Sequence, residues 1–337
     1  MGLYLDSGYL NQKWIYEQAK QINAAFIVEL GARQVGKTYG TLQLALQKKT
    51  PFILMRRSKN EADFISQGAV NPFLALGETD IYTKKQSEYT GGIFRNDEQI
   101  GLIMSLNSVA KIRGFYGGAY TDLIYDEFIP ENHVIKIRNE GDAFLNAIVT
   151  ISGNRELEGQ PPLLTWLLSN SNNIASPILA ALNLTDKIES MINRGQEFSA
   201  LPDRGIIIVM PKSEKVLNQR KQNAIVKAAG TESQFYQMAF ENRFSYNDAE
   251  NVKAKPLKEY RPLFTVDKKF TVYKHKDSMQ LYVTPYKKCS GKVFSDSQRG
   301  IREMLLYYPD LKVLYTTGKT YFQNLTIKQI YTECIKI

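Results

Sequence analysis

Long apolar runs alternate with helix-compatible stretches along the first two hundred residues of the chain. The apolar runs are mostly continuous, which is typical of strands in a parallel sheet that is covered on both faces. The predicted strands are 25–30, 51–56, 121–128, 163–170 and 205–210. The predicted helices between them are 38–49, 138–151 and 176–188. The pattern therefore predicts an α/β domain with a mainly parallel sheet flanked by helices.

Between Thr79 and Leu106 the pattern changes to short strands joined by turns, with the tip of a hairpin at 95–99. This predicts a small antiparallel insert in the α/β domain. After Met210 a polar, charged, helix-compatible segment follows, and then a loop-like stretch. Short aromatic strands are predicted beyond it at 263–275, 279–285 and 312–317, and a final helix at 326–337. We expect an N-terminal domain at 1–211, a helical linker at 212–247 and a small α+β domain at 248–337.

Composition narrows the class of protein. The 337 residues are 43% hydrophobic, and no apolar run reaches the length of a membrane span or of a signal peptide. We therefore expect a soluble intracellular protein with no membrane partner. Two histidines and two cysteines offer no zinc-ligand spacing. The formal net charge of +9 favours a polyanionic partner.

The strongest chemical motif follows the first predicted strand. The segment "GARQVGKT" matches the P-loop pattern of a glycine, four further residues and Gly-Lys-Thr, between a strand and a helix. In such loops backbone N–H groups and the helix N-terminus bind phosphate oxygens. The motif predicts an ATP site with Lys37 on the β- and γ-phosphates and Thr38 on Mg²⁺. The nucleotide-binding residues predicted here are Gly31, Ala32, Arg33, Gln34, Val35, Gly36, Lys37 and Thr38.

A second motif lies about ninety residues further on, where the apolar run "TDLIYDEF" ends in Asp126 and Glu127. This is the arrangement of a Walker B strand. Asp126 is predicted to hold the Mg²⁺ shell, and Glu127 to orient and deprotonate the attacking water. The two motifs together favour ATP hydrolysis over binding alone, in a P-loop fold of the additional-strand, catalytic-glutamate type. GTP is disfavoured because an Asn-Lys-x-Asp guanine motif is missing from any suitable place.

Several segments resemble one family, the large-subunit terminases that package viral DNA. They are "ARQVGKT", the strand "FILMRR", "KIRGFYGGAYTDLIYDEF" and "LLTWLLSN". Order, spacing and length most resemble the compact encapsidation ATPases of small short-tailed phages. The resemblance implies a homo-oligomeric ring, usually of five subunits, that moves double-stranded DNA into a preformed procapsid. It implies the portal and procapsid, and in some cases a structural RNA, as partners. It also implies residence in the host cytoplasm and transiently at the portal vertex, and absence from the mature virion.

The same resemblance assigns roles to individual residues. Arg155 is the candidate for the arginine that completes a neighbour's site, with Arg113 and Arg138 as competitors. Arg56 is the candidate switch that holds Glu127 idle, and Ser169 and Asn170 are candidates for coupling. For each residue a role outside the chemistry remains open, such as a solvent-exposed arginine or a polar residue that caps the end of a strand. Candidate DNA contacts on the phosphate backbone are Arg57, Lys59, Lys84 and Lys85.

Two further regions bear on nucleotide binding and on DNA cleavage. Tyr9, Gln12 and Trp14 precede the loop and could frame adenine or pack in the core. In the C-terminal region, Asp267, Asp277 and Asp296 lack the strand pattern of an RNase H-like metal site, so we expect a degenerate fold of that type without nuclease activity. Two alternatives to a packaging motor stay open. One is another P-loop nucleic-acid ATPase, such as a helicase or replication ATPase, and the other is a non-enzymatic nucleic-acid-binding protein with a relic P-loop.

Overall fold

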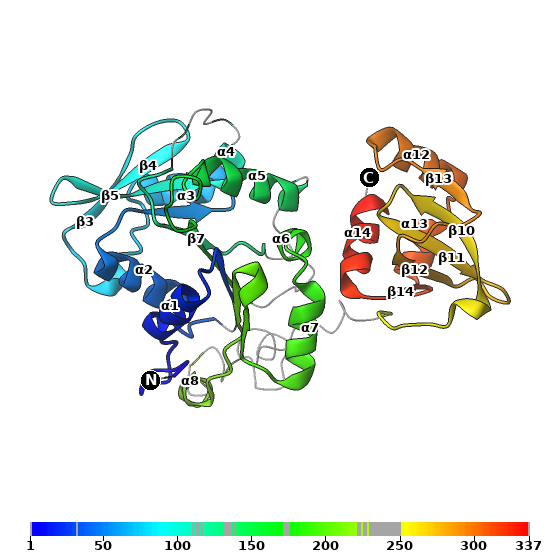
Figure 1. Cartoon of the computed structure of the whole chain (residues 1–337), viewed down its shortest axis with the longest axis horizontal. Helices are drawn as coiled ribbons and strands as arrows, with labels where there is room; N and C mark the ends of the chain where they lie inside the picture. Colours follow the sequence, from blue (N-terminus) through cyan, green and yellow to red (C-terminus); the bar gives the residue numbers. More distant parts are fainter. Residues whose placement is uncertain are drawn as a thin grey trace. The chain divides into compact units, whose positions relative to one another are not determined.

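The structure is a computed structural model that divides into two compact units (Figure 1). It describes residues 2–31, 33–109, 111, 115, 117–130, 137, 139–170, 176–220, 224, 228 and 251–335. The N-terminal unit comprises Met1–Asn172 and Met191–Phe244, and the C-terminal unit comprises Asn173–Ser190 and Ser245–Ile337. The linker predicted at 212–247 begins with helix α8 (Glu214–Arg220), and most of its remainder lies outside the described residues. The boundaries expected at 211 and 247 therefore stay predictions.

The N-terminal unit is built on a nine-stranded sheet in the order β3-β4-β5-β2-β6-β7-β1-β9-β8. Neighbouring strands from β5 to β9 in this order are parallel, as the continuous apolar runs predicted. These strands are β5 (Glu98–Ser105), β2 (Phe52–Arg56), β6 (Asp122–Asp126), β7 (Leu164–Asn170), β1 (Phe26–Gly31) and β9 (Ile206–Val209). Every predicted strand of this region is present within a few residues of its expected bounds.

Antiparallel strands lie at both edges of this sheet. The predicted insert is a meander of β3 (Ile81–Lys85), β4 (Thr90–Arg95) and β5. Its third strand also pairs in parallel with β2, so the insert extends the main sheet instead of forming a separate one. At the other edge β8 (Phe198–Leu201), which the sequence pattern did not predict, runs antiparallel to β9.

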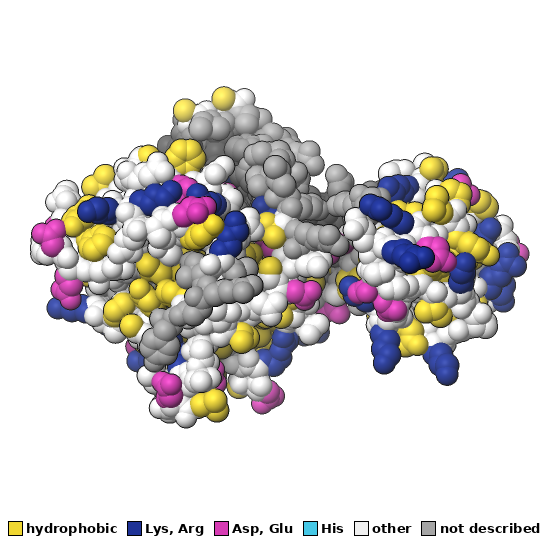
Figure 2. Space-filling model, turned by 90° about the horizontal axis from the view of Figure 1, so that it is seen from above, with side chains coloured by type: hydrophobic (Ala, Val, Ile, Leu, Met, Phe, Trp, Pro, Cys, Tyr) yellow, Lys and Arg dark blue, Asp and Glu magenta, His cyan; other side chains and the backbone are white. Residues whose placement is uncertain are grey.

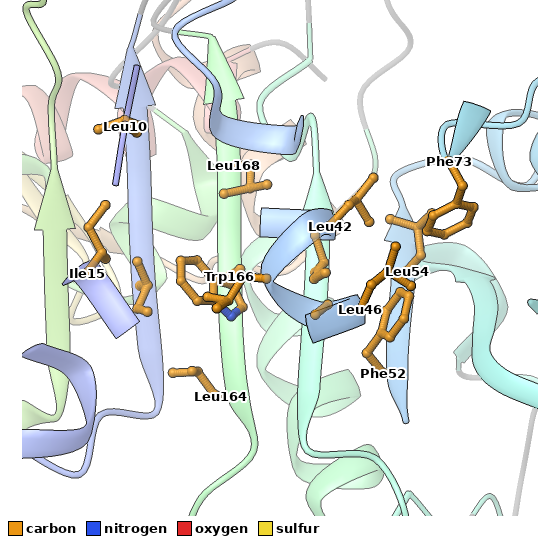
Figure 3. Packing of buried hydrophobic residues seen from close by; sticks show 14 of the residues in the cluster. Leu10, Ile15, Leu42, Leu46, Phe52, Leu54, Phe73, Leu164, Trp166 and Leu168 are labelled. Carbon is orange, nitrogen blue, oxygen red and sulfur yellow. The ribbon is translucent and has the colours of Figure 1, made fainter. Parts of the chain in front are cut away.

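Helices cover both faces of the parallel strands. On one face α1 (Gln12–Gln21) and α2 (Lys37–Lys48) contribute to a core around Trp166, which is 1% exposed. Figure 3 shows Leu42 and Leu46 of α2 beside Trp166 and Leu168 of β7. On the other face Phe144 of α5 (Glu140–Ser152) packs against aromatic rings of β1 and β6. The remaining helices of this unit are short: α3 (Lys59–Ser66), α4 (Leu106–Val109) and the 3₁₀ turns at Leu74–Leu76 and Pro202–Arg204.

The C-terminal unit has a five-stranded sheet in the order β13-β10-β11-β12-β14. Strands β10 (Tyr260–Val266), β11 (Phe270–His275) and β12 (Leu281–Pro285) form an antiparallel meander. Strand β13 (Lys292–Phe294) is parallel to β10, and β14 (Thr320–Phe322) is parallel to β12. Helices α12 (Gln298–Tyr307), α13 (Leu311–Thr316) and α14 (Leu325–Ile335) supply the rest of its core. The predicted α+β class and the final helix are confirmed.

Two predicted elements differ in the structure. The segment 312–317, predicted to be a strand, lies in helix α13. Its β-branched and aromatic residues favour a strand locally, but Leu311, Leu314 and Tyr315 recur at helical spacing and all pack into the core of the unit. The helix predicted at 176–188 is broken into α6 (Pro177–Ala181) and α7 (Thr185–Arg194) by a turn in which Asn183 has φ 48°. Among the described residues, no helix is long and apolar enough to cross a membrane.

Candidate functional site

The candidate site lies where neighbouring strands of the main sheet end together. Strand pairing places Leu30 beside Ser169 and Gly31 beside Asn170, while Asp126 of β6 pairs with Leu168 of β7. Because these strands are parallel, their carboxyl ends share one edge of the sheet, which is the usual ligand-binding edge in α/β proteins. The two predicted motifs therefore meet at the same place.

The P-loop connects β1 directly to helix α2. Gly36 has φ +93°, a left-handed conformation that favours glycine, and it precedes the first helical residue, Lys37. Gln34 also has positive φ, at 60°, a conformation that suits the tight turn of a phosphate-binding loop. Arg33 and Gln34 have exposed side chains, and Val35 is buried. Ala32 lies outside the described residues.

The Lys37 ammonium group lies inside the curve of the loop. Its Nζ atom donates to the carbonyl oxygen of Gly31 at 2.9 Å and to Oδ1 of Asn170 at 3.4 Å. The residue is only 6% exposed. Lys37 is thus held across the mouth of the loop, between the ends of β1 and β7, where a phosphate chain would meet it.

Thr38 and Asp126 meet directly, although 88 positions separate them. The Oγ1 atom of Thr38 donates to Oδ1 of Asp126 at 2.8 Å. The other carboxylate oxygen, Oδ2, accepts from Nη1 of Arg56 at 2.8 Å. Both oxygens of Asp126 are therefore engaged, one by the loop helix and one by the end of β2.

Arg56 was predicted to act on Glu127, and its geometry shows a different main partner. Its Nη1 atom lies 3.8 Å from Oε2 of Glu127, which is an ion-pair distance, but only 2.8 Å from Asp126. In this conformation the guanidinium group bridges the two acids and hydrogen-bonds the one predicted to hold the metal. The sequence could place Arg56 near the site, but not choose between adjacent carboxylates.

Glu127 follows the last residue of β6 in a strained backbone conformation, with φ 56°. This turn directs the chain away from the strand just where the side chain enters the site. Desolvation raises the pKa of Glu127, the Arg56 guanidinium opposes that rise and the Asp126 carboxylate adds to it, so that the net shift is upward. The side chain is 63% exposed, so solvent screens part of these effects.

Ser169 and Asn170 end strand β7 beside the loop. Ser169 is 3% exposed, and its hydroxyl donates to the backbone oxygen of Asn170 at 3.2 Å. Asn170 contacts Lys37 directly through its side chain. The structure therefore brings the predicted coupling residues into the site, with Asn170 in contact with the group that would bind phosphate.

Arg155 is not placed at this site. It is 4% exposed, and its guanidinium donates to two carbonyl oxygens of its own chain, Pro161 at 2.8 Å and Tyr120 at 2.7 Å. These bonds join the segment after α5 to the segment before β6. Acting on a neighbour's nucleotide would require both bonds to break. The competing candidates, Arg113 and Arg138, lie outside the described residues.

The candidate DNA contacts separate into two groups. Arg57 is 3% exposed and forms two hydrogen bonds with Glu140, at 2.6 and 3.1 Å, and Glu140 is 2% exposed. This buried pair leaves no guanidinium surface for a DNA phosphate, so the structure argues against that role. Lys59 and Lys85 lie at the surface but both pair with Asp63, at 2.9 and 3.0 Å, whereas Lys84 is exposed.

The residues that could frame adenine have different environments. Trp14 packs edge-on against Phe198, with ring centroids 5.1 Å apart, which is core packing. Gln12 is 4% exposed, and its amide donates to Glu29 at 2.9 Å. Tyr9 is 41% exposed and lies against Gly36, so it is the one of the three that keeps an open aromatic surface beside the loop.

Glu29 is the residue of this region that the sequence analysis did not single out. It lies in β1, two positions before Gly31, and is fully buried. The available signal was a lone acid in the otherwise apolar run "AFIVEL". A buried carboxyl group without an obvious partner is rare enough to mark a position for closer study.

The fold is that of a P-loop domain, and the contacts bring the predicted P-loop residues Lys37 and Thr38 together with Asp126, the predicted Walker B acid. Residues 6–330 match the family model described as podovirus DNA encapsidation protein (Gp16). The chain belongs to this family. A comparison with curated protein sequences gave no match.

Two solved structures support the fold over its full length. "The Phi-28 gp11 DNA packaging Motor" superposes with a TM-score of 0.67 at 16% identity, covering 98% of this chain and 99% of that one. A chain of "The bacteriophage Phi-29 viral genome packaging motor assembly" gives a TM-score of 0.63 at 15% identity, with 98% of each chain covered. At such low identity the likeness establishes the fold, and the residue roles depend on the geometry described above.

Proposed function

We propose that this protein is a Mg²⁺-dependent ATPase whose hydrolysis cycle drives double-stranded viral DNA into a preformed procapsid. The observation that carries the proposal is the 2.8 Å contact between Thr38 of the P-loop helix and Asp126 of the Walker B strand. A glycine turn that only connected a strand to a helix would not need this contact. Membership of a DNA encapsidation family supplies the substrate.

The oxygen atoms of Thr38 and Asp126 fit a Mg²⁺ ion, which prefers oxygen ligands and takes few of them from protein when nucleotide is bound. When bound, Mg²⁺ would neutralise charge on the β- and γ-phosphate oxygens. Lys37 would bind the same oxygens from inside the loop, exchanging its bonds to Gly31 and Asn170 for phosphate. Loss of the Asn170 bond would report phosphate binding to the end of β7.

Glu127 would act on the attacking water. Its carboxylate lies beside Asp126 but is 63% exposed, so it can reach toward solvent and a γ-phosphate. The upward pKa shift makes it a better proton acceptor than an ordinary surface glutamate. Arg56 opposes this by lying between the two acids. We infer an idle state in which Arg56 holds Asp126, and an active state in which nucleotide and metal replace that contact.

The site would be completed in a homo-oligomeric ring, for which a pentamer is the family expectation. A neighbour's arginine would stabilise the charge that develops on the γ-phosphate. Arg155 remains a candidate only if it leaves its bonds to Pro161 and Tyr120. Replacing Arg155 with lysine distinguishes a catalytic role at the neighbour's nucleotide from a structural role within its own chain. Loss of hydrolysis in an assembled, stable ring supports the catalytic role, and loss of stability alone supports the structural role.

We expect the DNA to contact the part of the chain in which positive charge is concentrated. Residues 251–337 contain 17 Lys and Arg against 7 Asp and Glu, whereas residues 1–250 contain 26 against 27. The entire basic excess of the protein thus lies in its last 87 residues. In Figure 2 many Lys and Arg side chains, in dark blue, lie on the visible face of the C-terminal unit. Such a surface favours binding to phosphates irrespective of sequence.

We further propose that the C-terminal unit does not cut DNA. Asp267 and Asp296 lie at the ends of the parallel strands β10 and β13, and the backbone N–H of Asp296 donates to Asp267 at 2.8 Å. The Lys269 ammonium group lies 2.8 Å from Asp296, where it supplies a positive charge without a metal. Among the described residues, no group of three or more potential metal ligands was found. Two-metal cleavage would need such a group.

Hydrolysis of ATP by the assembled protein, with DNA and procapsids present, tests the proposed activity. Thr38→Ala and Glu127→Gln should each lower the turnover rate by about a hundredfold or more, in line with loss of a metal ligand or a general base. Thr150→Ala is the matched control, because that threonine is exposed on α5 and bonds only its own helix. Normal turnover in Glu127→Gln would overturn the mechanism. Strand separation of a duplex by the wild type would indicate a helicase instead.

The remaining partners follow from the same proposal. The ring would contact the portal of the procapsid, and a structural RNA is a further possible partner within the family expectation. The protein would act in the host cytoplasm and at the portal vertex, and would be absent from mature virions. Immunodetection in purified procapsids and in finished particles would test this distribution.

A further inference from the structure

The N-terminal segment of the chain lies against the P-loop through several contacts. The backbone N–H of Leu10 donates to the carbonyl oxygen of Val35 at 3.1 Å. A side chain at Gly36 would lie 3.4 Å from Tyr9, and one at Gly40 would lie 2.8 Å from Gln12. The loop and the first turns of α2 are therefore fitted closely to residues 9–12.

Gln12 connects this segment to both sides of the loop. Its Nε2 atom donates to Oε2 of Glu29 in β1 at 2.9 Å and to the backbone oxygen of Lys37 in α2 at 3.5 Å. All three residues are buried, with exposures of 4%, 0% and 6%. The amide of Gln12 thus joins the strand that enters the P-loop to the helix that leaves it.

Two oxygen atoms of this buried group, Oε1 of Gln12 and Oε1 of Glu29, have no hydrogen-bond partner among the residues that the structure describes. An ionised Glu29 can only accept hydrogen bonds, so it could not satisfy either atom. A proton on Oε1 of Glu29 would supply the missing donor, because a carboxylic acid and a primary amide can pair through two hydrogen bonds in one ring, of which the Nε2–Oε2 bond is already present. Leaving buried polar atoms unpaired is costly, so the geometry favours the protonated acid.

We propose that Glu29 is a positioning residue that works as an uncharged acid, holding Gln12 and through it the first turn of the P-loop helix in the conformation that binds nucleotide. The proposal rests on the nucleotide-binding function proposed above. It gives the lone acid of β1 a role that neither hydrolysis nor metal binding requires.

The electrostatic surroundings agree with this assignment. Burial raises the pKa of Glu29 to about 7, against smaller downward effects of the Gln12 hydrogen bond and the Lys37 charge. Its strand neighbours Leu168 and Val209 are apolar. Among the described residues, Lys37 from α2 is the charged group that acts on it.

Nucleotide binding should therefore be linked to the proton on Glu29. Ionisation would place a negative charge beside Lys37 and compete with phosphate for its ammonium group. A bound polyphosphate would in turn hold the Glu29 proton more tightly, because linkage is reciprocal. Affinity for nucleotide should consequently fall as the pH rises through the neutral range.

The test measures the dissociation constant of a non-hydrolysable ATP analogue with the full-length protein between pH 6.5 and 8.5. The affinity of the wild type for the analogue should fall by roughly tenfold over this range, since the required proton on Glu29 is lost above its pKa. Glu29→Gln, which keeps an amide partner but cannot ionise, should bind like wild type at pH 6.5 and lose this dependence. The analogue's own phosphate titrates equally in both proteins, so the difference between them isolates Glu29. Identical pH profiles would overturn the proposal.

Glu29→Leu and Gln12→Leu provide the second measurement. Both should fold, because they place an apolar side chain in an apolar core, and both should weaken nucleotide binding at every pH. The double variant should bind nucleotide no more weakly than the weaker-binding single variant, because the two residues act as a unit. Fully additive losses, or equal binding by Glu29→Leu and Glu29→Gln, would contradict the proposal. Absence of any binding by wild type would instead reject the nucleotide function itself.

Discussion

At the scale of single residues, the main feature of the site is the pair of side chains that hydrogen-bond the Asp126 carboxylate. One carboxylate oxygen accepts from Thr38 and the other from Arg56, both at 2.8 Å. A metal ion bound by Thr38 and Asp126 would have to compete with the Arg56 guanidinium, which supplies positive charge to the same carboxylate. In the proposed mechanism this contact would act as a brake on hydrolysis, formed mainly at Asp126 and only weakly at Glu127.

Replacing Arg56 tests this brake. Arg56→Gln should raise the affinity for Mg²⁺ in the presence of nucleotide by several-fold, because a charge-assisted bond to Asp126 is removed. It should also raise the ATPase rate measured without DNA. Titrations of activity against Mg²⁺ concentration would measure both effects. An unchanged Mg²⁺ requirement would show that Arg56 does not compete for Asp126, and Arg204→Gln serves as a control in a 3₁₀ turn after β8.

The buried acid of β1 makes a separate prediction about folding. The pKa of Glu29 rises from 4.5 to about 7 in the folded protein, so the folded state binds the proton more tightly than the unfolded state. The contribution of Glu29 to the free energy of unfolding is therefore fully present below pH 4.5 and is lost as the pH rises to about 7. At about 1.4 kcal/mol per pKa unit, the loss is on the order of 3 kcal/mol.

Denaturant unfolding of wild type and Glu29→Gln across pH 5 to 8 would measure that loss. The difference in unfolding free energy between the two proteins should shift in favour of Glu29→Gln as the pH rises. Using the difference cancels the titration of other carboxyl groups, such as Asp63, whose pKa is lowered mainly by its hydrogen bond with Lys59. A difference independent of pH would mean that Glu29 is ionised in the folded state.

At the scale of elements, the end of β2 is fixed by two successive arginines with different tasks. Arg56 points to the site, whereas Arg57 pairs with Glu140 at the first turn of α5. Both members of the second pair are almost fully buried, so each needs the other to offset the loss of hydration. The pair therefore anchors α5 to the strand that carries Arg56.

Breaking this pair should be strongly destabilising. Arg57→Ala and Glu140→Ala should each lower the unfolding free energy by about 3–5 kcal/mol, because the remaining charge is left buried and unpaired. The double variant Arg57→Met with Glu140→Leu should lose much less, since it buries no charge. Thermal or denaturant unfolding measures all three. A small effect of the single variants would mean that the pair is solvated, and would reopen Arg57 as a DNA contact.

The sequence predicted the elements around the site well, because continuous apolar runs and glycine turns are local signals. Strand β1 before the P-loop, strand β6 that ends in Asp126 and strand β7 that ends in Asn170 all lie near their expected bounds. Helix α13 and strand β8 were not, since their conformations depend on which neighbours they pack against. The contacts of Arg56, Arg57 and Arg155 could not be predicted either. The partners of Arg56 and Arg57 lie 70 and 83 positions away along the chain. For Arg155, the sequence does not show whether the side chain is exposed or is bound to nearby backbone, as it is in the structure.

At the scale of the whole molecule, charge is divided between the two parts of the chain. Residues 1–250 are close to neutral and contain the candidate nucleotide site, whereas residues 251–337 carry the basic excess. The total charge of +9 does not show this uneven distribution. It suggests that nucleotide chemistry and DNA binding reside mainly in different regions.

Paired substitutions compare the two candidate DNA surfaces. Lys287 and Lys288 are exposed in the C-terminal unit, and Lys84 and Lys85 lie on the antiparallel insert of the other unit. Changing the first pair to glutamine should weaken duplex binding and reduce the slope of log affinity against log salt by about two. Changing the second pair should have the smaller effect. Electrophoretic or fluorescence titrations at several salt concentrations would decide, and the reverse order would place the main DNA contact on the insert.

If hydrolysis at Asp126 and Glu127 drives DNA into a capsid, the packaged DNA should become resistant to nuclease, and this resistance can be measured. Procapsids of the same virus, duplex DNA, ATP and purified protein are mixed, and DNA resistant to added nuclease is quantified. We predict full protection with wild type, and none with Glu127→Gln even though that variant still binds ATP. Protection by Glu127→Gln at the wild-type level, or protection by wild type without ATP, would show that ATP hydrolysis at this site does not drive packaging.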